Sequence, residues 1–229
     1  MSLNASPPHQ PIGSSYRLGR ALFRFVFTVY CRWDYFNPER VPSTGPVIIA
    51  SNHASFIDPP LVGSALERGL NFLARDTLFR FPLIGALLRS WNAVPVDREG
   101  GGAAGLRKIL EVLRAGNAIL VFPEGTRTSD DKLQPARSGI GLIVLKSEAP
   151  VVPARVFGTF HAYGRHVPFP RPVSIAVKYG QPLFFKELRE EARSCSKARL
   201  KEIYQQIADQ IMSAIAKLQP CRDVDRFPA

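Results

Sequence analysis

The chain has 229 residues, of which 45% are hydrophobic, and this length favours one domain with a full hydrophobic core. A mean hydropathy of −0.03 and a charged fraction of 21% exclude an integral multi-span protein and an intrinsically disordered chain. Thirty Lys and Arg residues against nineteen Asp and Glu give a formal net charge of +11, which favours phosphate-bearing ligands or an anionic membrane surface as partners.

The sequence lacks the patterns of nucleic-acid-binding and metal-binding proteins. No RNA-binding signature, zinc-ligand spacing or basic region with heptads is present, so nucleic acid is not expected as a partner. Cys31, Cys195 and Cys221 are odd in number and irregularly spaced, which predicts neither a disulfide framework nor a metal site. A reducing, cytosolic environment is the simpler interpretation.

The N-terminal part of the chain is predicted to form a flexible tail over residues 1–15, followed by an amphipathic helical segment over residues 16–42. Pro and Gly are frequent in the tail, which favours poor order. From residue 16 to 35, apolar and aromatic residues are mixed with Arg17, Arg20, Arg24 and Arg32. A membrane interface accommodates this mixture, and a surface helix packed on the protein core explains it equally well.

Neither a cleaved signal peptide nor a membrane-spanning helix is expected at this end of the chain. Residues 1–16 contain no Lys or Arg, although a signal peptide begins with a basic region. The apolar run over residues 21–31 is eleven residues long and contains Arg24, whereas a span needs about 20 apolar residues.

A single domain over residues 43–220 is predicted next, followed by a tail over residues 221–229. Short apolar runs typical of buried strands recur along it, at residues 47–50, 70–74, 93–96, 118–122, 151–156 and 173–179. Helical patterns lie between several runs, such as Leu106, Ile109, Leu110 and Leu113 with Gly116 as a C-cap. This alternation predicts an α/β domain with a mixed, mostly parallel central sheet flanked by helices.

The segment from Ser196 to Leu218 has the spacing of an amphipathic helix. Apolar residues recur at steps of three and four, at Leu200, Ile203, Tyr204, Ile207, Ile211, Ile215 and Leu218. One apolar face results, which predicts a helix docked on the core rather than a functional site.

The first informative polar residues follow the first strand of this domain. Asp58 precedes Pro59, so we predict Asp58 as a helix N-cap, with His53 in the turn before the helix. If the turn brings Asp58 to one ring nitrogen of His53, the other nitrogen becomes a better base toward an alcohol. The attacking group would then be the substrate's own hydroxyl. An equally good alternative is that Asp58 only caps the helix and His53 is a satisfied loop histidine.

Two arginines follow later strands of the predicted sheet. Arg98 comes after the run at residues 93–96, and Arg127 comes after the run at residues 118–122. Arginines at the same sheet edge can make bidentate contacts with a phosphate. Between them in the sequence, Glu124 is expected to hold an arginine or a glycerol hydroxyl, and Gly125 to allow close approach of the backbone to a ligand. Each arginine taken alone is more often a solvated surface charge.

At this point four ordered blocks of the chain resemble the glycerolipid acyltransferase family of the 1-acylglycerol-3-phosphate acyltransferase (PlsC) type. Asn52-His53-Ala54-Ser55-Phe56-Ile57-Asp58 is similar to the family's N-H-x-S-x-x-D pattern, and Phe122-Pro123-Glu124-Gly125-Thr126-Arg127 is similar to F-P-E-G-T-R. Residues 94–98 resemble the apolar strand that ends in D-R, and residues 151–154 resemble the apolar strand that contains Pro. The resemblance covers about residues 46–183.

The resemblance implies roles for individual residues. His53 and Asp58 would form the catalytic pair and Pro153 would shape the acyl site. The glycerol-phosphate end of the acceptor would be bound by Arg98, Glu124, Gly125, Thr126 and Arg127. Family members usually carry a Lys-x-Gly element after the third block, where this chain has Arg137-Ser138-Gly139. Arg keeps the charge but changes the geometry of a contact there.

The implied reaction transfers a fatty acyl group from acyl-CoA or acyl carrier protein to 1-acylglycerol-3-phosphate (lysophosphatidic acid), forming phosphatidic acid in phospholipid biosynthesis. No metal or bound cofactor is expected. Backbone N–H groups near the helix start after His53 are the expected donors to the oxyanion. Because the acceptor is a lipid, we expect a peripheral protein on the cytoplasmic face of the cell membrane, docked through residues 16–35.

Three other functions are compatible with parts of the pattern. A relative with another acceptor, such as a different lysophospholipid or an acylated amino-acid lipid, would keep His53 and Asp58. A serine hydrolase would use Ser55 and His53, but no G-x-S-x-G elbow surrounds Ser55. A non-catalytic membrane-binding module would have no use for a complete His-Asp pair.

Overall fold

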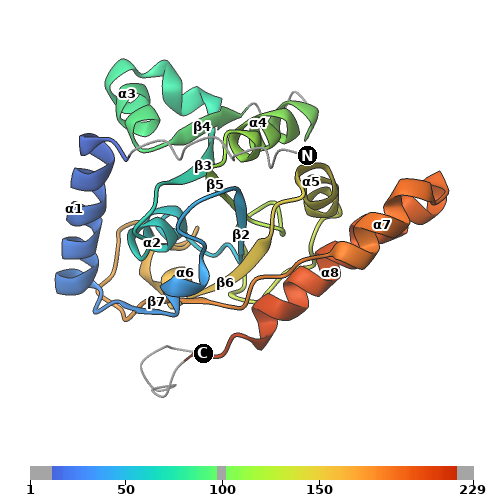
Figure 1. The fold of residues 1–229 in the computed structure, drawn as a ribbon. Coiled ribbons are helices and arrows are strands. Elements are labelled where there is room, and N and C mark those ends of the chain that lie inside the picture. The colour runs from blue at the N-terminus through green and yellow to red at the C-terminus, as the bar shows by residue number, and fades with distance from the viewer. Residues whose placement is uncertain (1–11, 97–101, 221–229) are drawn as a thin grey trace.

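The computed structural model describes residues 12–96 and 102–220. Its centre is a seven-stranded sheet with the order β1-β7-β6-β2-β5-β3-β4, and helices cover both of its faces (Figure 1). The strands are β1 (Asp34–Phe36), β2 (Val47–Ser51), β3 (Leu70–Arg75), β4 (Ala93–Val96), β5 (Ala118–Val121), β6 (Val151–Phe157) and β7 (Ala176–Tyr179). The α-helices are α1 (Ser14–Tyr30), α2 (Asp58–Ser64), α3 (Pro82–Ser90), α4 (Gly102–Arg114), α5 (Gly139–Ser147), α6 (Thr159–Tyr163), α7 (Lys186–Ser194) and α8 (Lys197–Lys217). Two short 3-10 helices, η1 (Pro38–Arg40) and η2 (Asp76–Arg80), complete the elements.

The sheet is mixed and mostly parallel, which confirms the predicted fold class. Strands β6, β2, β5, β3 and β4 run parallel to one another, β1 is parallel to β7, and the pairing of β6 with β7 is antiparallel. Five predicted strands form within about a residue of their expected ends, while the run at residues 173–179 becomes a strand only from Ala176. Strand β1 was not predicted.

Strand β2 lies in the middle of the core, because both of its faces are covered by helices. Val47 and Ile49 belong to the cluster that packs against α1 and α2, whereas Ile48 and Ala50 pack against α4, α5 and α8. All four side chains have no exposed surface. A strand buried on both faces reads as a continuous apolar run rather than an alternating one, which is why residues 47–50 were recognisable.

The last helix and the C-cap before β5 form as predicted. Ser196 caps α8 by accepting a hydrogen bond from the backbone N–H of Arg199 at 3.2 Å, and Ile203, Ile207, Ile211 and Ile215 are fully buried against the core. Gly116 follows α4 with a φ of +74° and donates its N–H to Leu113 at 3.0 Å. The positive φ explains why glycine terminates this helix.

The N-terminal helix is shorter than the segment predicted over residues 16–42. Helix α1 ends at Tyr30, and the chain then forms β1, because Asp34–Phe36 completes the sheet edge beside β7. The tails predicted over residues 1–15 and 221–229 lie largely outside the described residues, and the described part of the first tail already contains the start of α1. Within residues 12–96 and 102–220, no helix has both the length and the apolar character needed to cross a bilayer.

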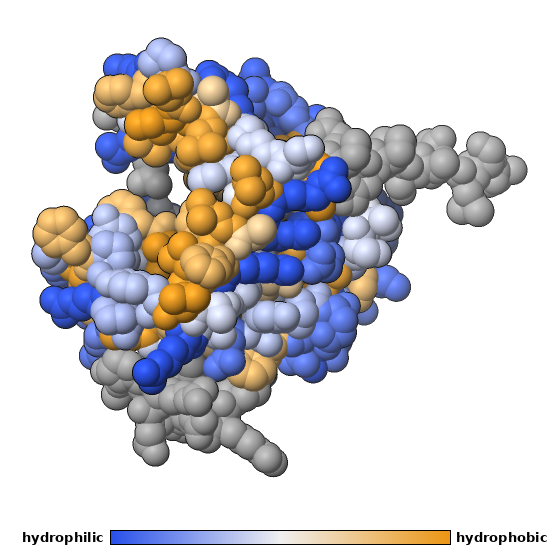
Figure 2. Space-filling view, turned by 90° about the vertical axis from the view of Figure 1, so that its left-hand side faces the viewer, coloured by the Kyte–Doolittle hydropathy of each residue, from blue (hydrophilic) through white to orange (hydrophobic). Residues whose placement is uncertain are grey.

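The two faces of α1 have different environments. Phe27 is 2% exposed and packs in the core beside α2, while Leu22, Phe25 and Val29 are 54%, 65% and 68% exposed. Figure 2 shows this side of the molecule, where hydrophobic residues gather at the surface. The helix therefore packs on the core with one face, as one interpretation of the sequence required, and leaves an apolar face uncovered.

Candidate active site

The carboxyl ends of β2, β5 and β6 bring three loops to one edge of the sheet. The first loop, after β2, carries His53 and leads into α2. The second follows β5 and contains residues 122–137, and the third follows β6 and continues through α6 to Arg165. Because β5 and β6 flank β2 and run parallel to it, these loops converge where ligand sites of α/β proteins usually lie.

His53 and Asp58 are in direct contact. Nδ1 of His53 lies 2.8 Å from Oδ2 of Asp58, and this carboxylate is completely buried, whereas 14% of the His53 side chain is exposed. An ionised carboxylate can only accept, so the Nδ1 proton is donated to Asp58 and Nε2 carries the free lone pair. A histidine held in this tautomer can take a proton from an alcohol.

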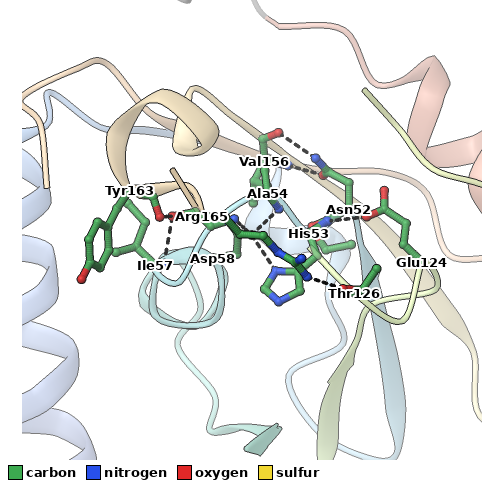
Figure 3. Close-up of polar contacts among 12 residues, drawn as sticks. Asn52, His53, Ala54, Ile57, Asp58, Glu124, Thr126, Val156, Tyr163 and Arg165 are labelled. Carbon is green, nitrogen blue, oxygen red and sulfur yellow. Dashed lines mark hydrogen bonds and ion pairs between the residues drawn. The ribbon is translucent and has the colours of Figure 1, made fainter. Parts of the chain in front are cut away.

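Asp58 is not the N-cap that the sequence predicted. Ile57 occupies the N-cap position of α2 and Asp58 is the first helical residue. Its Oδ2 turns back and accepts the backbone N–H groups of Ala54 and Ser55, each at 2.7 Å. The alternative in which Asp58 only caps a helix is therefore wrong. Its carboxylate binds the backbone of the turn and contacts the imidazole of His53 at the same time (Figure 3).

Asn52 fixes the start of the same turn. Its side chain donates to the backbone oxygen of Val156 at 3.2 Å and accepts from the backbone N–H of Val156 at 2.8 Å. The backbone pairing between β2 and β6 ends at Ser51. The side chain of Asn52 continues this pairing by one residue and thereby anchors the neighbouring His53 to β6. This residue was quoted in the first block but had not been assigned a role.

Phe122 supports the imidazole from the side of β5. The rings of His53 and Phe122 are stacked, with centroids 3.8 Å apart and an interplanar angle of 11°. The backbone of His53 also contacts this loop, because its carbonyl accepts from Thr128 N–H at 2.8 Å. These contacts restrict the imidazole to one orientation.

The carboxylate of Glu124 binds backbone N–H groups of two loops. Its Oε2 accepts from His53 N–H at 3.1 Å and its Oε1 from Gln134 N–H at 3.3 Å. The side chain is 4% exposed, and this burial raises the pKa of Glu124 to about 7, against the lowering effect of the two N–H donors. The structure thus uses this carboxyl to join the loops after β2 and β5.

Gly125 is exposed in the second loop, and Thr126 and Arg127 after it are half-buried. Gly125 has a φ of +72°, a backbone conformation that favours glycine. A Cβ there would lie 2.8 Å from Cδ of Arg137, so the arginine side chain would have to shift. Thr126 Oγ1 accepts a hydrogen bond from Arg165. The guanidinium of Arg127 stacks 3.5 Å above the centroid of the Phe56 ring.

Of the remaining predicted site residues, Arg98 lies outside the described residues. Pro153 is buried in the middle of β6, where it is paired with Ala50. A Cβ added to Gly180 would lie only 2.8 Å from Cγ of Pro153. Pro153 therefore packs against the segment after β7.

Two further expectations about this loop are not supported by the geometry. Ser55 is completely buried, and its Oγ donates to the carbonyl of Tyr163 at 2.6 Å, so it does not face His53 as a hydrolase nucleophile.

The backbone N–H groups of four residues after His53 are engaged within the protein. Those of residues 54 and 55 bind Asp58, that of Phe56 binds Tyr163, and that of Ile57 binds Ser55. These four N–H groups are therefore not available to an oxyanion. In the described part of the chain no group of three or more metal-ligating side chains occurs.

A family model described as Acyltransferase matches residues 32–157. This range begins just before β1 and ends with β6, and it includes His53, Asp58 and the whole loop after β5.

Proteins named 1-acyl-sn-glycerol-3-phosphate acyltransferase are similar to this chain. The protein from Bacillus subtilis is 33% identical over 124 residues, which are 54% of this chain and 61% of that protein. The protein from Limnanthes douglasii is 34% identical over 174 residues, which are 73% of this chain and 62% of that protein. The chain thus spans less than two thirds of the length of each of these relatives.

The fold is also similar to that of a solved structure. The crystal structure of the 1-acyl-sn-glycerophosphate (LPA) acyltransferase from Thermotoga maritima has a TM-score of 0.68 and 23% sequence identity, and the alignment covers 90% of this chain and 81% of that one. This similarity concerns the fold alone.

Proposed function

The chain belongs to the acyltransferase family, and we propose that it transfers a fatty acyl group from a thioester donor to the free hydroxyl of 1-acylglycerol-3-phosphate. The product is phosphatidic acid, which enters phospholipid biosynthesis. The observation that carries the proposal is the contact between His53 and the buried Asp58, which leaves the lone pair of Nε2 to act as a base. The names of the relatives support the choice of acceptor.

In the proposed reaction, His53 Nε2 takes the proton of the acceptor hydroxyl while the oxygen attacks the thioester carbonyl carbon. Asp58 keeps the Nδ1 proton and stabilises the imidazolium that forms. The carbon–sulfur bond then breaks, the thiolate leaves with the electron pair, and the proton on Nε2 passes to the sulfur. An ester and a free thiol are produced and His53 becomes neutral again, so the scheme balances without a metal or a bound cofactor.

The glycerol-phosphate end of the acceptor is proposed to lie against the loop after β5. Arg127 supplies a guanidinium suited to phosphate, and Arg98 is proposed to act with it. Gly125 and Thr126 precede Arg127 in the same loop and are proposed to line the same part of the site. Glu124 contributes indirectly, because its carboxyl is occupied by the two backbone N–H groups that set the loop's position.

An apolar pocket beside α1 and α2 is proposed to hold an acyl chain. Phe23, Leu70, Phe72 and Trp91 contribute to its lining, and Phe56 lies at its edge. Because Phe56 also carries the guanidinium of Arg127 on its ring, it lies between the pocket and the polar site. Pro153 does not contribute to this lining, so we assign the acyl chain to this pocket and not to the surroundings of Pro153.

The uncovered face of α1 is proposed to dock on the cytoplasmic, anionic face of the cell membrane. Exposed apolar residues of α3, including Leu83 and Leu87 at 87% and 45% exposure, add to those of α1. Apolar side chains at a membrane interface gain by leaving water, and the net charge of +11 adds attraction to anionic lipids. The same charge favours either anionic donor, acyl-CoA or acyl carrier protein.

Product identification tests the proposed function. The purified chain is incubated with palmitoyl-CoA or palmitoyl-acyl carrier protein and a panel of lyso-lipids in phospholipid vesicles, and the products are identified by mass spectrometry. We expect phosphatidic acid from lysophosphatidic acid. Acylation of another lysophospholipid or of an amino-acid lipid in its place would support the alternative acceptor, and free fatty acid without any acylated lipid would identify a hydrolase.

A further inference from the structure

Arg165 is anchored to the loop that carries His53, although it lies more than a hundred positions later in the sequence. The carbonyl of Tyr163 accepts from Ser55 Oγ at 2.6 Å and from Phe56 N–H at 3.4 Å. Gly164 then turns the chain away from α6, and a Cβ there would lie 2.4 Å from the carbonyl oxygen of Phe160. The backbone of Arg165 is therefore placed by contacts with the turn between His53 and Asp58.

The side chain of Arg165 is fixed on the loop after β5. Its Nη2 donates to Oγ1 of Thr126, and in Figure 3 the side chain crosses toward Thr126 in the part of the view that holds the His53 ring. A guanidinium has five N–H donors, and Thr126 accepts from one of them. The residue is exposed, and within the described part of the chain no carboxylate forms an ion pair with it.

The environment of Arg165 differs from that of an ordinary surface arginine. Such a residue usually points into solvent and has many rotamers. In contrast, the chain two residues before Arg165 is fixed to the loop after β2 through the carbonyl of Tyr163, and the guanidinium binds Thr126 in the loop after β5. Thr126 is neutral, so the contact orients the guanidinium without cancelling its charge. Arg127, by comparison, stacks on the Phe56 ring. Arg165 thus brings a second, oriented cation to the loop of Thr126.

We propose that Arg165 is a specificity-determining residue that binds the phosphomonoester group of the acceptor. The inference rests on the proposed function. A planar guanidinium held at one edge presents its other N–H groups as a fork that fits two oxygens of one phosphate. Arg165 would then select acceptors with a phosphate over neutral ones. The donor acyl-CoA also carries phosphates, so the test must separate the two sources.

Steady-state kinetics of Arg165→Gln separate them. For this variant we expect the KM for lysophosphatidic acid to rise about tenfold, and the preference for lysophosphatidic acid over monoacylglycerol to fall by a similar factor, while the KM for palmitoyl-CoA stays within about twofold. Arg165→Lys keeps the charge but not the fork, so its KM should lie between those of the wild type and Arg165→Gln. Arg114→Gln is the matched control, because Arg114 is exposed in the last turn of α4, at the opposite sheet edge. It should change none of these values.

Equilibrium binding distinguishes failure of this inference from failure of the proposed function. Binding of a short-chain lysophosphatidic acid and of the matching monoacylglycerol is measured by calorimetry for the wild type and Arg165→Gln. A wild type that binds lysophosphatidic acid through Arg165 without acylating it would remove the proposed function but keep the anion site. An unchanged lysophosphatidic acid affinity and KM in Arg165→Gln would overturn the inference, as would a rise in the KM for palmitoyl-CoA alone.

Discussion

Nδ1 of His53 lies 2.8 Å from Oδ2 of Asp58, the same oxygen that accepts the backbone N–H groups of Ala54 and Ser55. One buried carboxylate atom therefore sets both the path of the turn and the proton position on the imidazole. Substitutions at these two positions are expected to differ in their consequences, since one removes the base and the other changes its support.

Replacing His53 with Ala should abolish acyl transfer while leaving the protein folded. The imidazole would act on the transition state, and its loss is expected to lower turnover by at least about 1,000-fold. The fold should survive, because the backbone contacts of His53 with Glu124 and Thr128 do not involve its side chain. Thiol release and thermal unfolding of the purified variant measure the two effects.

A second histidine provides the control for this substitution. His161 contacts Asp131, with its Nε2 at 3.2 Å from Oδ2, so His161→Ala also removes a histidine from a His-Asp contact. Its turnover should stay within a few-fold of the wild type. Turnover close to the wild-type value in folded His53→Ala would exclude His53 as the base.

Replacing Asp58 with Asn should lower turnover by about 100- to 10,000-fold. The amide oxygen can still accept from Ala54 and Ser55, but it no longer carries the charge that stabilises an imidazolium. Because the new amide nitrogen is fully buried, we also expect a loss of about 1 to 3 kcal/mol in the free energy of unfolding. Rates under saturating substrate and urea titrations check both, and a variant as active as the wild type would show that the carboxylate charge is not used.

Replacing Asn52 with Ala should reduce both stability and turnover. It leaves the N–H and the carbonyl of Val156 without their side-chain partners, which is expected to cost about 2 to 4 kcal/mol. The turn that carries His53 would also lose its attachment to β6. Asn71→Ala is a matched control, because Asn71 donates to Ala118 from β3, away from the turn. The control should lose stability without losing turnover per folded molecule, and the same pattern in Asn52→Ala would assign it a structural role alone.

Local patterns in the sequence were sufficient for the central strands, because buried strands show as apolar runs. They left the contact between His53 and Asp58 open, since the path of the turn also depends on Asn52, whose side chain binds Val156 of β6. Strand β1 was missed because Asp34–Phe36 is short and pairs only with β7, far along the chain. Its formation depends on a partner that no local pattern identifies.

The sequence also did not predict which groups the polar side chains of the site contact. Glu124 stands beside Arg127 in the third block, yet its oxygens accept from the backbone of His53 and Gln134. Arg165 belongs to none of the four sequence blocks. The contacts of Tyr163 with the loop after β2 bring it to the site. Such contacts form between loops that are far apart in the sequence. They therefore depend on the order of strands in the sheet and not on the spacing of residues along the chain.

Glu124 should make stability depend on pH. Burial raises its pKa from the ordinary value of 4.5 to about 7, so the folded state keeps a proton that the unfolded state releases above pH 4.5. The contribution of this proton is fully present below about pH 4.5 and is lost as the pH rises through 7. In Glu124→Gln this position does not titrate. The free energy of unfolding of the wild type, relative to Glu124→Gln, should therefore fall by roughly 2 to 3 kcal/mol between these limits. A difference that stays constant in urea titrations across this range would contradict the raised pKa.

The uncovered face of α1 should bind membranes without supporting the fold. Leu22, Phe25 and Val29 are more than half exposed, so the triple change to Ser should leave the melting temperature nearly unchanged. Each of these side chains contributes about 1.5 to 3 kcal/mol if it enters the bilayer fully. We therefore expect the triple variant to bind vesicles that contain an anionic phospholipid at least about 100-fold more weakly in co-sedimentation. Deletion of the chain before Asn37 cannot replace this variant, because it removes β1 and the buried Phe27 along with the exposed face.

The matched control for the membrane experiment is an exposed aromatic residue on another part of the surface. Phe184 is 56% exposed and precedes α7, so Phe184→Ser removes exposed apolar surface away from α1. If α1 is the docking surface, Phe184→Ser keeps wild-type vesicle binding. Added salt should weaken the vesicle binding of both the wild type and Phe184→Ser, because the basic charge of the protein contributes to it. Vesicle binding that is equally strong in the triple variant and in the control would show that the membrane contact lies elsewhere, even if the enzyme still acylates lipids in the vesicles.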